Sequence, residues 1–179
     1  CRFLVSVDNC RKISCNQMGW RKIKVLDINK IYEMLDWKNP SAVQRKGIKL
    51  AREIDDLSLL IQPPAVPSVW EHCAEVLCEK SDAELEPYLD ELLEWLQDLN
   101  WPGAVMIAER LKTFSGEKLK KPLENAIIKS NKMPNNERLM WQDYLSELLD
   151  NGVLATSLSK ENFALLKKHY HNWGNWYSE

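Results

Sequence analysis

Apolar side chains recur every three or four residues from Ile28 onward, which is the period of an amphipathic α-helix. Prolines, glycines and capping residues interrupt the pattern and divide it into about eight predicted helices. These helices are expected to start near residues 28, 41, 68, 87, 102, 122, 135 and 160. Helix should therefore dominate the fold, with strand confined at most to the first 25 residues.

Several residues mark the expected helix boundaries. Asp27, Ser41 and Ser159 are each predicted to cap the amino end of a helix. Pro122 is predicted to open a helix, because proline is tolerated in the first turn. Asn151-Gly152 is predicted to end a helix in a left-handed C-cap.

The inward faces follow from the same period. Val105, Ala108 and Leu111 are expected to share one inward face, and the segment after Pro87 carries the strongest leucine stripe. The side chains predicted to be largely buried are Leu89, Leu92, Leu93, Leu96, Ile127 and Leu145.

Taken in pairs, the predicted helices begin near residues 28, 68, 102 and 136, a spacing of about 34 to 40 residues. Helical solenoids show this spacing, because each helical pair buries its apolar face against its neighbours. A non-repeating helical bundle of the same size is the alternative.

The 179 residues fit one domain by length, and 45% of them are hydrophobic, which is enough for a sizeable core. Residues 27–179 are predicted to form that single helical-repeat domain. Residues 1–26 are expected to be an N-terminal arm or a leading segment foreign to the native protein. No apolar run is long enough to cross a membrane, and the five cysteines have no disulfide-framework or metal-binding spacing. A reducing cytoplasm is the expected compartment.

Charge is unevenly distributed along the chain, although the net charge is only −2. Residues 1–60 carry 12 Lys and Arg against 7 Asp and Glu, residues 71–98 carry 1 against 10, and residues 99–132 carry 7 against 3. A general nucleic-acid binder needs a basic footprint, so this balance argues against nucleic acid as the partner. The acidic block points instead to a basic protein.

Carboxylates recur every four residues within the acidic block. Such spacing stacks like charges on one side of a helix, at a cost of a few tenths of a kcal/mol for each pair. Two interpretations stay open, a solvated face and a surface for a basic partner. The candidate partner-binding residues are Glu86, Asp90, Glu91, Glu94, Asp98 and Trp101. Trp101 lies between Asn100 and Pro102, at the predicted corner between two helices.

No candidate catalytic, cofactor or metal site emerges from the sequence. His72 neighbours Cys73, but adjacent helical residues diverge by about 100° and cannot hold one metal together. Phosphate-binding glycine loops, nucleophile elbows and zinc-helix motifs are missing from the sequence. The chain is therefore not expected to be an enzyme.

Three segments resemble a family of bacterial HEAT-like-repeat domains of unknown function. The most specific is Leu92-Leu93-Glu94-Trp95-Leu96-Gln97-Asp98-Leu99-Asn100-Trp101-Pro102-Gly103-Ala104. The other two are Val43-Gln44-Arg45-Lys46-Gly47-Ile48-Lys49-Leu50-Ala51 and Trp70-Glu71-His72-Cys73-Ala74. The resemblance covers about residues 28–132 and implies a HEAT-like α-solenoid, here of about eight helices in four antiparallel pairs, without enzyme activity.

Three functions are compatible with these patterns. The leading hypothesis is a protein-binding module, monomeric when free, and its sharpest form is an immunity protein that neutralises a basic bacterial toxin. A HEAT-like DNA glycosylase acting on alkylated bases is the second, which the abundance of Trp favours and the net charge opposes. A structural adaptor in a larger assembly is the third.

Overall fold

The computed structural model describes residues 27–64 and 67–172, and this part of the chain is helical, without any strand. The prediction of an all-α fold is confirmed there. The expectations for residues 1–26 and for the aromatic residues Trp173, Trp176 and Tyr177 fall outside the described residues.

The first two helices show how local chemistry sets the boundaries. α1 (Ile28–Leu35) begins after Asp27, whose carboxylate accepts a hydrogen bond from the Asn29 N–H at 3.2 Å, as the sequence predicts. α2 (Ser41–Ala51) begins differently, because Pro40 occupies the cap position and no side chain caps the helix. The prediction that Ser41 is the cap was therefore wrong.

The later α-helices are shorter and more often interrupted than the periodicity suggests, because 3₁₀ turns replace several predicted helix ends. The α-helices that follow are α3 (Trp70–Cys78), α4 (Asp82–Leu85), α5 (Leu89–Glu94), α6 (Ala104–Lys112), α7 (Gly116–Ser130), α8 (Asn135–Ser146), α9 (Gly152–Ser157) and α10 (Lys160–His169). The 3₁₀ segments are η1 (Leu57–Leu60), η2 (Pro67–Val69), η3 (Glu86–Tyr88), η4 (Trp95–Gln97) and η5 (Glu147–Asp150).

Three local predictions are corrected by the structure. Pro122 lies inside α7 rather than at its start. Asn151 is the N-cap of α9 rather than part of a C-cap: its side chain accepts from the Leu154 N–H at 3.1 Å and donates to the Phe114 carbonyl at 2.8 Å. Val105 was expected to face inward and is 55% exposed, because the inward side of α6 is formed by other residues, including Ala108 and Leu111.

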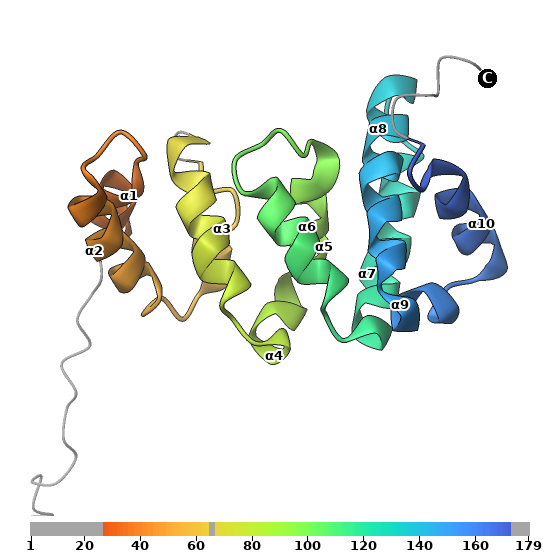
Figure 1. The fold of residues 1–179 in the computed structure, drawn as a ribbon, viewed down its shortest axis with the longest axis horizontal. Coiled ribbons are helices and arrows are strands. Elements are labelled where there is room, and N and C mark those ends of the chain that lie inside the picture. Colours follow the sequence, from red (N-terminus) through yellow and green to blue (C-terminus); the bar gives the residue numbers. More distant parts are fainter. Residues whose placement is uncertain (1–26, 65–66, 173–179) are drawn as a thin grey trace, which may run out of the picture.

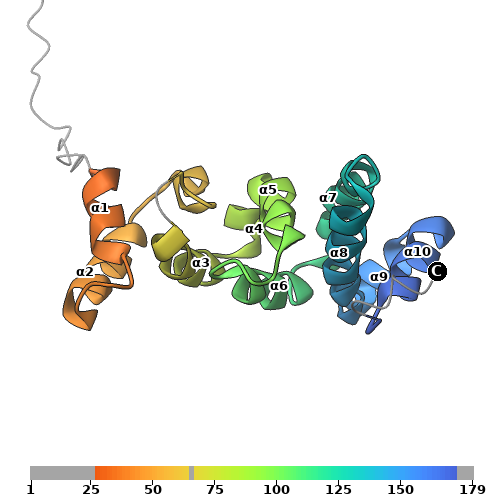
Figure 2. The same cartoon turned by 90° about the horizontal axis from the view of Figure 1, so that it is seen from above.

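The helices follow one another in two rows (Figures 1 and 2). α2, α3, α6 and α8 lie in one row, and α1, α5 and α7 lie in the other. Within the rows α2 contacts α3, α3 contacts α6, and α5 contacts α7, while α1 packs on α2 and α7 on α8 across them.

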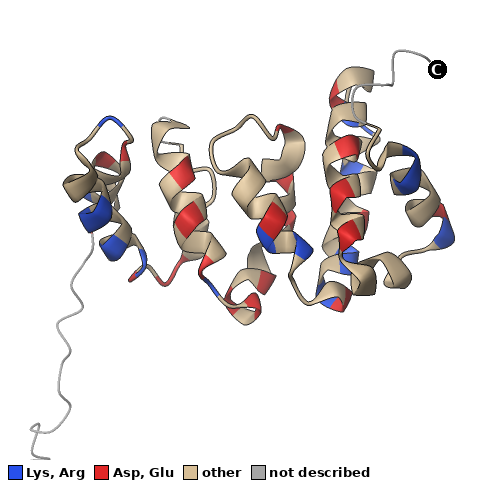
Figure 3. Cartoon of the chain, viewed as in Figure 1, with Lys and Arg blue, Asp and Glu red and all other residues tan. Residues whose placement is uncertain are grey.

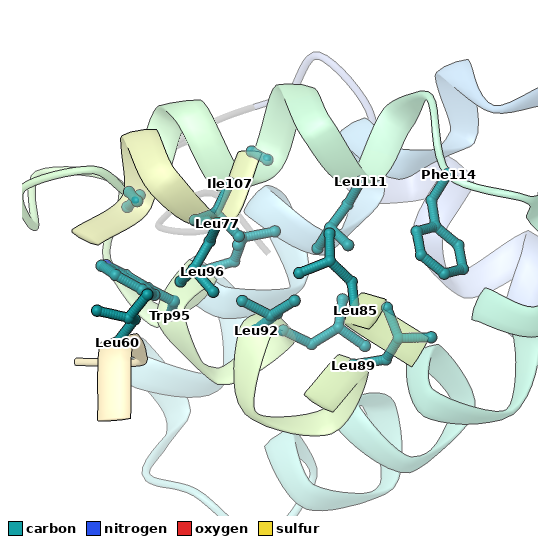
Figure 4. Close-up of a cluster of buried hydrophobic side chains, with 14 of the residues drawn as sticks. Leu60, Leu77, Leu85, Leu89, Leu92, Trp95, Leu96, Ile107, Leu111 and Phe114 are labelled. Carbon is teal, nitrogen blue, oxygen red and sulfur yellow. The ribbon is translucent and has the colours of Figure 1, made fainter. Parts of the chain in front are cut away.

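The core runs between the rows as one continuous cluster of buried side chains. Figure 4 shows Leu89, Leu92 and Leu96 in one cluster with other buried side chains, with Leu96 beside Leu77 of α3 and Leu89 beside Leu85. All six side chains that the sequence predicts to be buried are buried: Leu89, Leu92, Leu93, Leu96, Ile127 and Leu145.

Tryptophans tie the rows together. Trp95 is fully buried and donates its indole N–H to the Pro102 carbonyl at 3.2 Å. Trp141, also fully buried, donates to the Leu93 carbonyl at 3.1 Å, across 48 residues of chain. Trp70 packs edge-on against both Trp95 and Trp101, with ring centroids 6.1 and 6.0 Å apart. The aromatic rings therefore fix the corner between η4 and α6.

The corner depends on Gly103, which has a left-handed φ of 81°. A Cβ atom at this position would lie 2.5 Å from the Ala74 Cβ and 3.1 Å from the Trp70 carbonyl oxygen. Any L-residue here would meet both backbone strain and a steric clash with α3.

Gly103→Ala should therefore lower the free energy of unfolding by roughly 2–5 kcal/mol, the combined cost of the left-handed backbone and of overpacking. Gly152→Ala is the matched control, because nothing lies within 4 Å of its added Cβ. Its effect should stay within about 1 kcal/mol. Urea unfolding followed by tryptophan fluorescence measures both. Equal losses in the two variants would show that the close approach of α3 and the corner is not essential.

Candidate functional site

Residues 81–98 of the acidic block, called the acidic segment below, form the run from α4 to η4. Ser81 starts it with a capping box: its hydroxyl accepts from the Glu84 N–H at 3.4 Å, and Glu84 accepts from the Ser81 N–H at 2.9 Å. The leucine stripe then turns inward, which leaves the carboxylates outside. Residues 81–98 contain no Lys or Arg, and their acidic residues are Asp82, Glu84, Glu86, Asp90, Glu91, Glu94 and Asp98.

α7 lies beside α5 and supplies partners to one side of the carboxylate column. Lys118 pairs with Glu86 at 2.6 Å, and Lys129 pairs with Glu94. Between these two ion pairs the Asn125 amide donates to Asp90 at 3.3 Å. Glu86 and Glu94 are thus partly neutralised by the chain itself.

The other predicted carboxylates have no cationic partner among the described residues. Asp90 and Glu91 are exposed on α5. Asp98 is half-buried and accepts from the Asn100 N–H at 2.8 Å, which holds the corner. Trp101 is also half-buried and packs against Trp70, so its position serves the corner between η4 and α6. The structure therefore brings Asp90 and Glu94 to one hollow, leaves Glu86 and Glu91 elsewhere on the same segment, and uses Asp98 and Trp101 in contacts of the corner.

A hollow lies on each side of the segment from η3 to α5. One, of about 270 Å³, lies between α5 and α7 over Ala126, with the buried ring of Trp141 beneath. Its polar walls are Asp90, Glu94, Asn125 and Lys129. The other, of about 330 Å³, lies toward η1 and is lined by Ile54, Asp55, Leu57, Lys80, Ala83, Glu84, Pro87 and Tyr88. No sequence signal marks the hollows, because their walls come from segments that are separate in the sequence.

Asp82 anchors the acidic segment to the next helices. Its two carboxylate oxygens accept from Arg110 at 2.6 Å and from the Ser115 N–H and hydroxyl at 2.8 and 2.5 Å. Burial raises the pKa of this carboxyl, but the hydrogen bonds from Ser115 and Arg110 outweigh it and hold the pKa below its usual value.

A second polar cluster, which sequence reasoning missed, joins α10 to α8 and η5 to α6. His169 lies 2.7 Å from the nearly buried carboxylate of Asp143. Lys112 lies 2.9 Å from Glu109 and 3.1 Å from Asp150. Burial lowers the pKa of Lys112, but hydrogen bonds to Glu109 and Asp150 outweigh it and raise the pKa above its usual value. These contacts hold α10 against α8 and η5 against α6.

Other chemistry is sparse in the part of the chain that the structure describes. No group of three His, Cys, Asp or Glu side chains there is arranged to hold a metal ion. His72 contacts Gln44 at 3.0 Å, which links α3 to α2. Burial raises the pKa of the Cys73 thiol to about 12. None of the described helices is both long enough and apolar enough to span a membrane.

A family model described as a domain of unknown function (DUF5071) matches residues 71–172. This match takes in the acidic segment, both ion pairs to α7 and the cluster around α10, and it extends well beyond residue 132, where the sequence resemblance stopped. No curated protein and no solved structure matches the chain.

Asp82→Asn should lower the free energy of unfolding by roughly 1–3 kcal/mol at neutral pH, because both oxygens of Asp82 accept hydrogen bonds and one would become an NH₂ donor. Because the pKa of Asp82 is lower in the folded state, its ionised carboxylate stabilises the fold at pH values above its unfolded-state pKa of about 3.9. The difference between wild type and Asp82→Asn should thus shrink as the pH falls through the folded-state pKa. Asp90→Asn, which loses only one long hydrogen bond, is the control. Thermal unfolding between neutral and acidic pH measures both, and a pH-independent difference would contradict the account.

Proposed function

The chain belongs to the DUF5071 family, and from the geometry of its acidic segment we propose that it is a non-enzymatic protein-binding module whose acidic segment binds a basic partner. One observation carries the proposal: Asp90 and Glu91 are exposed and have no cationic partner among the described residues, and Asp90 lines the hollow between α5 and α7. Unpaired charge beside a hollow gives a partner both an electrostatic attraction and a place for its side chains.

The surroundings of these carboxylates suit a peptide-like ligand. The ion pairs from Lys118 to Glu86 and from Lys129 to Glu94 flank Asp90, so a basic side chain would enter between groups that are already ordered. Ile128, next to Lys129 on α7, is 57% exposed and offers apolar contact area. The partner that fits is a basic segment carrying some apolar side chains.

We also propose that the two rows of helices form a HEAT-like α-solenoid of antiparallel pairs. Similar hydrogen bonds from a basic side chain to a backbone carbonyl recur between neighbours in the row of α2, α3 and α6, and they support this arrangement. Lys80 donates to the Arg52 carbonyl at 3.2 Å, and Arg110 donates to the Lys80 carbonyl at 3.0 Å, across 28 and 30 residues of chain. A solenoid exposes an extended surface to a partner.

The most specific form of the proposal is an immunity protein that neutralises a basic toxin. Its monomeric state before binding would leave the acidic segment available. The DNA-glycosylase alternative has less support, because phosphate binding needs a basic face. On the face seen in Figure 3, acidic positions mark α3 and α8, and α6 carries positions of both signs.

Charge reversal tests the proposal. Asp90→Lys combined with Glu91→Lys should slow association with a labelled Lys- and Arg-rich peptide about tenfold at low salt, and the loss should shrink as salt rises. Stopped-flow fluorescence measures the rates, and a Gln-substituted peptide reports non-electrostatic binding.

Glu33→Lys combined with Glu53→Lys is the matched control, since both carboxylates are exposed and the net charge changes equally. Equal slowing in the two double variants would mean that only net charge matters. Unchanged rates in the Asp90 and Glu91 variant would place the binding site elsewhere.

A further inference from the structure

A basic surface lies on α2, well apart from the acidic segment. The cations Arg45, Lys46 and Lys49 are exposed, and α2 contains no Asp or Glu. None of these three cations forms an ion pair with a described residue. Arg52, just past the helix, differs: it is held by Glu79 at 2.6 Å and Glu75 at 3.9 Å. Figure 3 shows the basic positions of α2 beside the acidic positions of α3.

An aromatic side chain stands at the start of this surface on a fixed turn. Trp37 is 47% exposed, although its backbone N–H donates to the Ser68 carbonyl at 3.2 Å and its carbonyl accepts from the Gln44 amide at 3.0 Å. Gln44 also donates to the Asn39 carbonyl. Val43, in the first turn of α2, is 37% exposed. An ordered turn with an exposed indole is a suitable anchor, because little conformational entropy is lost on binding.

We propose that α2 and the turn before it bind a short acidic peptide segment that carries an aromatic or aliphatic side chain. The carboxylates of that segment would pair with Arg45, Lys46 and Lys49, and its apolar side chain would pack on Trp37 and Val43. The eleven residues of α2 extend about 16 Å, the length of about five residues of extended peptide.

The neighbouring charges favour a short ligand over a polyanion. A nucleic acid that passed along the row would leave α2 and meet Glu71, Glu75 and Glu79 on and just after α3, of which Arg52 neutralises only the last two. Repulsion there confines an anionic ligand to the face of α2. The surface is separate from the acidic segment and attracts the opposite charge, so this inference stands apart from the proposed function.

The probe for this surface is a fluorescein-labelled peptide of Asp and Glu residues with one Phe, measured by fluorescence anisotropy. Lys46→Glu combined with Lys49→Glu should weaken binding about tenfold or more, and Trp37→Ala should weaken binding of the Phe peptide but not of its Phe-to-Gly analogue. The indole N–H signal of Trp37 should shift in NMR spectra when the peptide binds.

Lys121→Glu combined with Lys168→Glu is the matched control, because both lysines are exposed and have no ion-pair partner among the described residues. It should leave peptide binding within about twofold of wild type, and the α2 variant should still bind the basic peptide. Unchanged affinity in the α2 variant, with unchanged melting temperature, would overturn the proposal. So would tighter binding of single-stranded DNA or anionic vesicles at α2, or self-association that the α2 variant abolishes.

Discussion

The described helices bury their apolar faces against neighbouring helices of the two rows. The whole structure depends on this burial between helices. The clearest case is Trp141, which reaches from α8 to the Leu93 carbonyl. The same segment is held on its other side by Trp95, packed against Trp70 of α3. α5 has only six residues, too few to be stable as an isolated helix. Its position, and that of the carboxylates on it, comes from these contacts.

Two rows of helices leave many outward side chains exposed, so the arrangement of charge decides what the surface can bind. Ion pairs between neighbouring helices neutralise much of that charge, as in the pairs of Arg110 with Asp82 and Lys118 with Glu86. Unpaired charge remains at Asp90 and Glu91 and, with the opposite sign, on α2. Surface ion pairs contribute little stability, typically below about 1 kcal/mol. Their main effect here is to determine which charges remain available to a partner.

The amphipathic period was sufficient to predict the helical fold and the buried leucines, because the stripe from Leu89 to Leu96 is strong over two turns. It failed where a residue has two compatible roles. Asn151 suits either end of a helix, and only the contact with the Phe114 carbonyl shows that it begins α9. The carboxylate column was visible as spacing, but its pairing was not, since Lys118 and Lys129 lie more than 30 residues away. The hollows and the cluster around Asp143 depend on the same kind of long-range contact.

Amide hydrogen exchange, measured with and without the Lys- and Arg-rich peptide, tests most directly whether the acidic segment is a binding face. Binding between α5 and α7 should slow exchange across residues 82–97 and in the part of α7 from Lys118 to Lys129, and should leave α2 unchanged. Slowed exchange confined to other helices, or no change anywhere at a peptide concentration that saturates binding, would contradict the account.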